Sequence, residues 1–376
     1  MSEQRVLRLA EEIIAQVEPG RPADGVIRGR LRQGDREIRA LGREISSAVF
    51  AFYRWRGLLE SDEPVREQIR EALRRDEAFG AEGRSLERDV LAAVVPAWVT
   101  DVMTPTEAWL RSLQTPPRLW LRCRKPETLK EIDSLDHFRA PEPSPGSGAF
   151  EYLGQRDLFR TSSFHQGDFE IQDLSSQWVG MLCGVRPGET WWDVCAGEGG
   201  KFLDLAERMG NRGQIWVTDR SARRLQVLKR RAARAGVFNY RLKQADVRRG
   251  APFRVQFDGV LLDAPCSGIG TWQRNPDARW TTTLEDVMAL AEIQKQLLAG
   301  AASRIKSGGR LIYAVCTLAR QETDEIVDWF LSNHSDFSAG RFSPTEATDL
   351  DSTERCWLGC DGSGGNGMFV ARFDRR

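Results

Sequence analysis

Several features that define common protein classes are missing from this chain of 376 residues. No hydrophobic run approaches the roughly 20 residues that cross a bilayer. The first residues, Met1-Ser2-Glu3-Gln4-Arg5, form no apolar signal segment. We therefore expect a protein that stays in the cytoplasm and has no membrane partner, with a monomer as the default state.

Paired cysteine motifs are also missing. The chain has seven cysteines, an odd number, and none of them is paired at C-x-x-C spacing. Without a secretory signal, this pattern indicates reduced thiols and neither a disulfide framework nor a zinc cage. No bound metal is expected.

An excess of charge of either sign is missing too, because 54 basic residues balance 54 acidic ones. The distribution is uneven, however: between Arg220 and Arg249 the chain has eleven cations and a single acid, Asp246. A local field of this size can hold a phosphate backbone. A solvated helix face, with Leu225 and Leu228 on its buried side, is an equally good interpretation of the same residues.

The pattern along the chain predicts three regions. Residues 1–95 show helical spacing of apolar residues and predict an all-helical module, and residues 96–163 predict a compact mixed α+β connector. From 164 to 376, strands alternate with helices, which is typical of a parallel sheet covered by helices on both faces. Strands are expected at 190–194, 214–217, 240–244, 257–262, 310–315 and 366–373, and helices from 201 and over 221–235, 284–305 and 321–332.

A glycine-rich loop follows the first of these strands, in Trp191-Trp192-Asp193-Val194-Cys195-Ala196-Gly197-Glu198-Gly199-Gly200-Lys201. A dinucleotide fingerprint, G-x-G-x-x-G, is missing because Phe202 stands where the third glycine is required. Asp219 and Asp246 follow the next two strands, where an acid can bind ribose hydroxyls and an adenine amine. One ribose, one adenine and no phosphate describe S-adenosylmethionine, although each acid alone could be a helix cap.

Two cysteines follow apolar runs 50 positions apart, Cys266 in Asp263-Ala264-Pro265-Cys266-Ser267-Gly268 and Cys316 in Tyr313-Ala314-Val315-Cys316-Thr317. Both should reach one pocket at the carboxyl edge of the sheet. Methylation of carbon 5 of a pyrimidine requires a thiolate to add at carbon 6 first, and a second thiol can assist its release. Asp263 can hydrogen-bond the ring nitrogen and the exocyclic amine of cytosine. Ordinary burial is the better interpretation for Cys183 and Cys195.

At these residues the chain resembles the RsmB (Sun, Fmu) family of ribosomal RNA cytosine-5 methyltransferases, within the NOL1/NOP2/Sun group. The resemblance includes residues 164–180, the glycine-rich loop, both thiol segments and Arg274-Asn275-Pro276-Asp277. It implies a class I methyltransferase fold, a doubly wound Rossmann-like sheet, preceded by the connector and by a helical module similar to NusB that binds RNA. Asp35 to Arg56 carry the resemblance to that module.

The resemblance also implies residue roles. Cys316 would be the nucleophile, Cys266 the release cysteine, Asp263 the acid that activates cytosine, and Lys201 a group that reaches the reacting centre. The S-adenosylmethionine site would consist of Cys195, Ala196, Gly197, Glu198, Gly199, Gly200, Lys201, Asp219, Arg220, Asp246 and Asp263.

Three departures from the family pattern leave alternatives open. Gly197-Glu198 replaces Ala-Pro in the loop C-A-A-P-G-G-K, Val315-Cys316-Thr317 replaces T-C-S, and Asn366-Gly367-Met368-Phe369 replaces D-G-F-F. Glu198 could meet the cofactor's ammonium group or weaken the contact of its carboxylate. The favoured substrate is small-subunit (16S) ribosomal RNA. Transfer RNA, or a non-catalytic role as an RNA-binding assembly factor, are the alternatives.

Overall fold

The computed structural model describes residues 2–81, 88–342, 354–359 and 364–376, so that Cys360 and residues 82–87 of the expected helical module lie outside it. The chain divides into two compact units, residues 1–117 with 267–287 and residues 118–266 with 288–376. None of the helices in the described ranges is long and apolar enough to span a membrane.

The first unit is helical, as the spacing of its apolar residues predicts. Leu9, Ile13, Ile45 and Val49 recur on the inner faces of their helices and are fully buried in one core. Its helices are α1 (Ser2–Ile14), α2 (Ala23–Gln33), α3 (Arg36–Ala40), α4 (Gly42–Trp55), α5 (Val65–Ala81), α6 (Arg88–Ala92), α7 (Val99–Val102), α8 (Glu107–Ser112) and α14 (Ala278–Thr281).

The helical unit also contains residues 267–287, which the sequence pattern assigned to the methyltransferase region. Arg279 is fully buried and donates hydrogen bonds to the backbone carbonyls of Arg54, Val94 and Leu113. Asp277 accepts a 2.9 Å bond from the backbone amide of Ala23. A buried guanidinium must be hydrogen-bonded, so these long-range bonds, which no local pattern reveals, decide the position of the segment.

The second unit contains a small antiparallel sheet and a large mixed sheet. The small sheet has the order β2-β3-β1-β4 and carries short helices. Its strands are β1 (Trp120–Cys123), β2 (Phe138–Arg139), β3 (Ala149–Tyr152) and β4 (Phe169–Ile171), and its helices are α9 (Leu129–Ile132) and α10 (Ser162–Gln166).

The large sheet has the order β10-β12-β9-β8-β5-β6-β7, with β11 beside β12. The central strands β9, β8, β5, β6 and β7 are parallel. From β5 the chain adds β6 and β7 on one side, and then crosses back to add β8 and β9 on the other side, so the strand order reverses between the neighbours β5 and β8. The strands are β5 (Thr190–Asp193), β6 (Gln214–Asp219), β7 (Tyr240–Gln244), β8 (Phe257–Asp263), β9 (Ile305–Val315), β10 (Phe337–Gly340), β11 (Arg355–Leu358) and β12 (Met368–Arg375).

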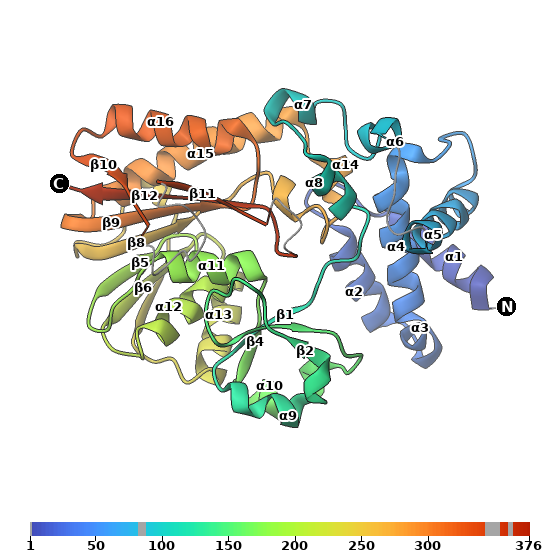
Figure 1. Ribbon diagram of the computed structural model, residues 1–376, viewed down its shortest axis with the longest axis horizontal. Coiled ribbons are helices and arrows are strands. Elements are labelled where there is room, and N and C mark those ends of the chain that lie inside the picture. The colour runs from blue at the N-terminus through green and yellow to red at the C-terminus, as the bar shows by residue number, and fades with distance from the viewer. Residues whose placement is uncertain (1, 82–87, 343–353, 360–363) are drawn as a thin grey trace. The chain divides into compact units, whose positions relative to one another are not determined.

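Helices cover both faces of the large sheet, as Figure 1 shows, with α15 and α16 on one face and α11 to α13 on the other. The alternation of side chains along a strand divides the core between these faces: neighbouring Trp191 and Trp192, both fully buried, belong to opposite layers. The helices are α11 (Leu174–Leu182), α12 (Gly200–Arg208), α13 (Ala222–Arg234), α15 (Leu284–Ala302) and α16 (Asp324–Asn333).

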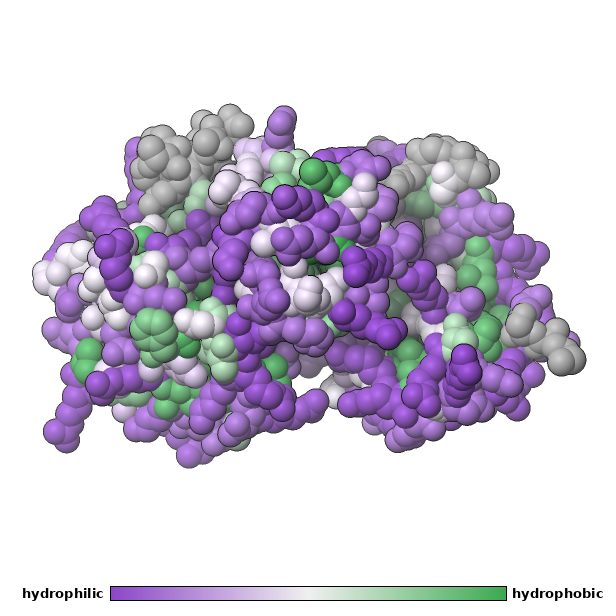
Figure 2. Space-filling view, turned by 90° about the horizontal axis from the view of Figure 1, so that it is seen from below, coloured by the Kyte–Doolittle hydropathy of each residue, from purple (hydrophilic) through white to green (hydrophobic). Residues whose placement is uncertain are grey.

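Hydrophilic residues cover most of the face of the larger unit that Figure 2 shows. The expected doubly wound α/β fold, preceded by a helical region, is thus confirmed.

The boundaries of the compact units differ from the expected ones at residues 95 and 163. Residues 96–117 belong to the helical unit, and β4 completes the small sheet although it follows residue 163. Strand pairing, which joins segments distant in the sequence, causes the second difference. The division into three domains at residues 1–95, 96–163 and 164–376 stays a prediction.

Candidate active site

A pocket of about 590 Å³ opens at the carboxyl ends of the central strands of the large sheet. The reversal of strand order between β5 and β8 creates a crevice there, which is where open α/β sheets bind ligands. Its lining residues come from the larger unit alone: Gln172, Ser176, Asp193 to Glu198, Gly200, Lys201, Asp219, Arg220, Arg224, Ala245 to Arg248, Asp263 to Cys266, Ile293, Leu297 and Cys316.

The glycine-rich loop connects β5 to α12 and forms one wall of the pocket. Gly197 has φ +56 and faces open space, so its backbone can approach a ligand closely. Gly199 is expected in the cofactor site but does not line the pocket. With φ +87, a Cβ atom there would lie 2.7 Å from Leu228, so this glycine lets the loop pack against α13. The side chain of Glu198 is exposed at the rim.

The two predicted acids stand at the ends of β6 and β7, and both line the pocket. Asp219 accepts hydrogen bonds from the backbone amides of Gly197, at 2.9 Å, and Ser221, at 2.7 Å, so its carboxylate shapes the glycine loop. Asp246 accepts from the side chain of Arg248, and this bond lowers the pKa of Asp246 to about 2. Arg220 is exposed beside them.

Asp193, the last residue of β5, is a pocket residue that the sequence pattern does not reveal. It is 1% exposed, and neither of its carboxylate oxygens has a hydrogen-bond partner among the described residues. Burial, followed by the nearby charge of Asp263, raises the pKa of Asp193 well above its ordinary value. An acid at the carboxyl end of the first strand is the signal that could have identified it.

Lys201 and Asp263 form an ion pair inside the pocket. Lys201, in the first turn of α12, places Nζ 2.8 Å from Asp263 Oδ2 and 3.1 Å from the hydroxyl of Ser176. Burial alone lowers the pKa of Lys201, but the charge and hydrogen bond of Asp263 outweigh it, so the net pKa is raised. The lysine is therefore a cation held at the end of β8.

The two predicted thiols meet beside this pair. In the parallel pairing of β8 and β9, Asp263 lies opposite Ala314, so the residues just past both strands reach the same edge. Cys266 Sγ and Cys316 Sγ are 3.3 Å apart, and both line the pocket. The expected convergence of these two side chains is confirmed.

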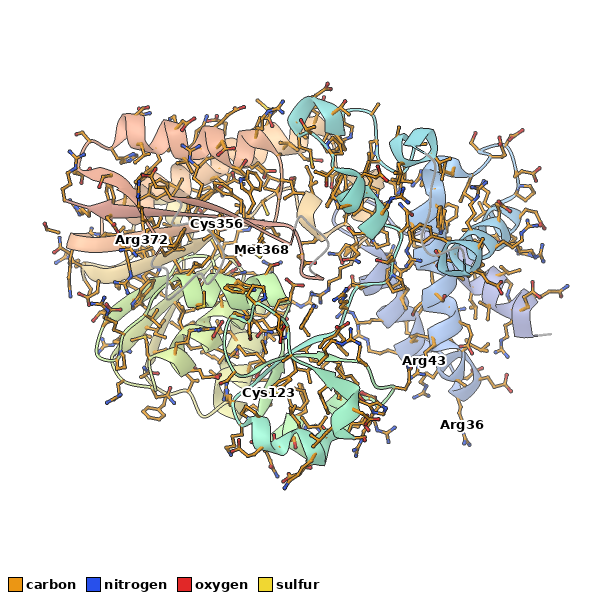
Figure 3. All side chains as sticks on the ribbon, viewed as in Figure 1. Arg36, Arg43, Cys123, Cys356, Met368 and Arg372 are labelled. Carbon is orange, nitrogen blue, oxygen red and sulfur yellow. The ribbon has the colours of Figure 1, made fainter. Side chains whose placement is uncertain are left out.

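The other described cysteines differ from this pair. Figure 3 shows Cys123 in the small sheet and Cys356 in the large one, and both are buried. Burial raises the pKa of Cys123 to about 12 and also raises that of Cys183. Cys195 lines the pocket, yet burial raises its pKa as well. A raised pKa makes Cys123, Cys183 and Cys195 poor sources of a thiolate.

A Rossmann-like sheet with a glycine loop after its first strand and acids after the next two is typical of enzymes that bind a nucleoside-containing cofactor, a class that includes the methyltransferases. Within this class, residues 181–374 match the family model of the 16S rRNA methyltransferases RsmB/F. The chain belongs to this family.

Curated relatives align with about half of the chain. A "probable ribosomal RNA small subunit methyltransferase B" from Synechocystis sp. is 40% identical over 184 residues, which are 48% of this chain and 41% of the relative. "Ribosomal RNA small subunit methyltransferase F" from Salmonella heidelberg is 36% identical over 182 residues, 48% of this chain and 38% of the relative. The chain therefore spans well under half the length of these relatives.

Solved structures share the fold. The crystal structure of PH0851 covers 100% of this chain and 99% of its own, with a TM-score of 0.80 and 22% identity, and shows the fold alone. A methyltransferase homolog from Pyrococcus horikoshii, 26% identical, covers 72% of this chain and 90% of its own with a TM-score of 0.60. NSun6 from the same organism, determined with SFG, is 25% identical, with a TM-score of 0.53 over 61% of this chain and 60% of its own.

The cofactor of this methyltransferase family is S-adenosylmethionine. The pocket fits this group because the buried carboxylate of Asp193 has no protein partner. A buried charge is costly unless it is paired, and the ammonium group of the cofactor is a suitable partner. Gly197 offers close backbone approach on the same wall.

Proposed function

We propose that this protein transfers a methyl group from S-adenosylmethionine to carbon 5 of a cytosine in RNA, with small-subunit ribosomal RNA as the favoured substrate. The observation that carries the proposal is the pair of thiols 3.3 Å apart, in the same pocket as the Lys201–Asp263 pair. Methylation of an exocyclic amine would need no thiol.

The cofactor would occupy the wall formed by the glycine loop, Asp193 and Asp219, and would supply the methyl group. The thiolate of Cys316 adds to carbon 6 of the flipped-out cytosine, which makes carbon 5 nucleophilic. Asp263 accepts a hydrogen bond from the exocyclic amine of cytosine, while Lys201 neutralises the charge of the Asp263 carboxylate. After methyl transfer, a base removes the proton from carbon 5, and Cys316 leaves carbon 6 with the help of Cys266.

Basic residues of α13 and β7 would bind the RNA backbone. Eight cations between 220 and 249 are exposed and, in the described part of the chain, take part in no ion pair: Arg220, Arg223, Arg224, Lys229, Arg230, Arg241, Lys243 and Arg249. Arg220 and Arg224 also line the pocket. This charge therefore extends from the site onto the surface, as a phosphate backbone requires.

The test is covalent trapping. Each variant is incubated with S-adenosylmethionine and 16S ribosomal RNA or transfer RNA, then run on a denaturing gel. Cys316→Ala should abolish methyl transfer and form no adduct, whereas Cys266→Ala should accumulate a covalent protein–RNA adduct. Cys356→Ala, at a buried thiol in β11, is the control and should behave as the parent.

Full turnover by Cys316→Ala would overturn the assignment. Bisulfite sequencing of ribosomal and transfer RNA from a deletion strain then identifies the substrate, because it shows which methylcytosine is lost. RNA binding without any methyl transfer by the parent protein would favour the assembly-factor alternative.

A further inference from the structure

A network of fully buried polar side chains lies directly behind the two thiols. Its members are Tyr313 in β9, Thr317 just after Cys316, Gln294 in α15, and Glu322 in the turn before α16. Each of the four is 0% exposed. Buried polar groups are costly unless hydrogen-bonded, so a cluster of this kind persists only when its members satisfy one another.

Glu322 connects the network to the loop of Cys316. One carboxylate oxygen, Oε2, accepts a 3.0 Å bond from the hydroxyl of Thr317, the residue after the thiol. The same hydroxyl accepts a 3.3 Å bond from the backbone amide of Ala319. The chain that leaves Cys316 is therefore held at the buried carboxyl group of Glu322.

Gln294 connects the network to the loop of Cys266. Its amide nitrogen donates to two acceptors, each at 2.9 Å: the backbone carbonyl of Pro265, the residue before the thiol, and Glu322 Oε1. A single side-chain amide thus joins the Cys266 loop to the carboxylate that holds the Cys316 loop.

Tyr313 fixes the back of the network. Its hydroxyl lies 2.7 Å from the backbone carbonyl of Glu322 and 3.0 Å from Gln294 Oε1, and it donates its one proton between them. Burial, reinforced by the charge of Glu322, raises the pKa of Tyr313 far above its ordinary value, so the hydroxyl stays a donor. Gln294 and Glu322 therefore cannot rotate independently.

We propose that Glu322 and Gln294 are positioning residues that hold the attacking and releasing thiols at a set separation, Glu322 through Thr317 and Gln294 through Pro265. The inference rests on the proposed function, because it assigns the network to that same site. A displacement of about 1 Å at a reacting centre can lower a rate about 100-fold, so such a network is expected to act on the rate of chemistry more than on substrate binding.

The test of the Cys316 side compares Thr317→Val with Thr317→Ser. Valine has nearly the same shape but no hydroxyl, so Glu322 Oε2 loses this partner. Its kcat should fall by about 10-fold to 100-fold, the loss expected from displacement of a reacting group. The KM values for RNA and S-adenosylmethionine should stay within about twofold, because neither binding surface changes. Serine keeps the hydroxyl and should restore kcat to within about threefold of the parent. Glu322→Gln replaces one of the two acceptor oxygens with an NH2 donor and should resemble the valine variant.

A matched control separates positioning from general destabilisation. Thr161 is 2% exposed, and its hydroxyl donates to the carbonyl of Leu158 and accepts from the amide of Phe164, outside the pocket. Thr161→Val should lower the melting temperature about as much as Thr317→Val and leave kcat unchanged. If Glu322→Gln does not fold, the Thr317 pair decides the result.

The Cys266 side has its own readout. Gln294→Met removes the bond to Pro265 and should slow release more than attack, so a larger fraction of enzyme should be trapped as RNA adduct at steady state. A purely structural role would lower attack and release together and would trap no more adduct than the parent.

The two proposals fail in different ways. If the parent makes no methylcytosine and Cys266→Ala traps no adduct, the proposed function fails. If the parent is active and Thr317→Val keeps its kcat, with no extra adduct in Gln294→Met, only the positioning role is overturned.

Discussion

The two halves of the pocket are built differently. The thiol half, at the ends of β8 and β9, is supported by buried side chains whose hydrogen bonds satisfy one another, from Gln294 and Glu322 to both cysteine loops. The cofactor half, at the ends of β5, β6 and β7, contains the buried carboxylate of Asp193, which has no hydrogen-bond partner in the part of the chain that the structure describes.

Under the proposed function, this difference corresponds to the different tasks of the two halves. A group that must attack a carbon atom benefits from being fixed before the substrate arrives. A group that binds a charged cofactor can instead remain unpaired and gain its partner on binding, at a cost to the stability of the free protein. Under the proposed function, the thiol half would be preorganised for chemistry, and the cofactor half would be arranged for binding.

The largest expected effect tests the thiol half of the pocket. Asp263→Asn replaces the carboxylate that holds Lys201 and should lower the rate of methyl transfer by about 100-fold to 10,000-fold, the usual range for loss of a catalytic acid or base. Asp258→Asn is the control, because Asp258 also lies in β8 and pairs with a lysine, Lys306, at 2.7 Å. Single-turnover transfer of labelled methyl groups measures the rates of both variants. Equal rates in Asp263→Asn and Asp258→Asn would show that Asp263 takes no part in the chemistry.

The next effect concerns cofactor affinity. Asp219→Ala removes a charged acceptor and frees the glycine loop, so we expect S-adenosylmethionine to bind about 10-fold to 100-fold more weakly, as for loss of a charged hydrogen bond. Asp246→Ala should have a smaller effect, because Arg248 already occupies that carboxylate. Calorimetry measures both constants. Unchanged binding by Asp219→Ala would contradict the binding role of this half.

A smaller effect is expected where the basic surface leaves the pocket. The triple variant Arg223→Glu, Lys229→Glu and Arg230→Glu reverses exposed charges on α13. RNA affinity should fall about tenfold at moderate salt, and the salt dependence should become weaker because fewer counterions are released. Arg254→Glu, at another exposed arginine, is the control, with filter binding at several salt concentrations as the measurement. An unchanged salt slope would favour the solvated-face interpretation.

The smallest effect separates stability from binding at Asp193. In the folded protein the pKa of Asp193 is raised, so folding favours the protonated form and stability is lost as the pH rises through that pKa. Asp193→Asn should therefore raise the melting temperature at pH 7 by about 2–4 °C, the shift expected from about 1 kcal/mol. The gain should shrink toward pH 4, and S-adenosylmethionine should bind more weakly. A lower melting temperature at pH 7 would show that Asp193 is paired in solution.

Much of the fold could be predicted because its signals are local. Alternating apolar residues predict β7 at residues 240–244, as observed, and the helical spacing of apolar residues predicts α13 to within one residue of each observed end. The predicted start of β9 is wrong, because the strand begins at Ile305 and not at Arg310. Ser307, Gly308 and Gly309 have no strand-like pattern of their own, and this part of β9 depends on pairing of Ile305 with Phe257.

The site could be predicted where one residue type carries the chemistry. A cysteine just past a strand is visible in the sequence. The proposed positioning role of Gln294 or Glu322, in contrast, depends on hydrogen bonds to segments up to 29 residues away. Asp193 gave a weaker signal, because an acid at the end of a strand has no distinctive chemistry until its burial is known.

By itself, then, the sequence determined the order of strands and helices, the glycine loop, the acids and the two thiols, since these follow from side-chain periodicity and residue chemistry. Only the tertiary structure decided that the thiols lie 3.3 Å apart, that residues 267–287 join the helical unit, and that Asp193 is buried without a protein partner. The physical reason is that burial and hydrogen bonding are shared between distant segments, and their energies exist only once the chain has folded.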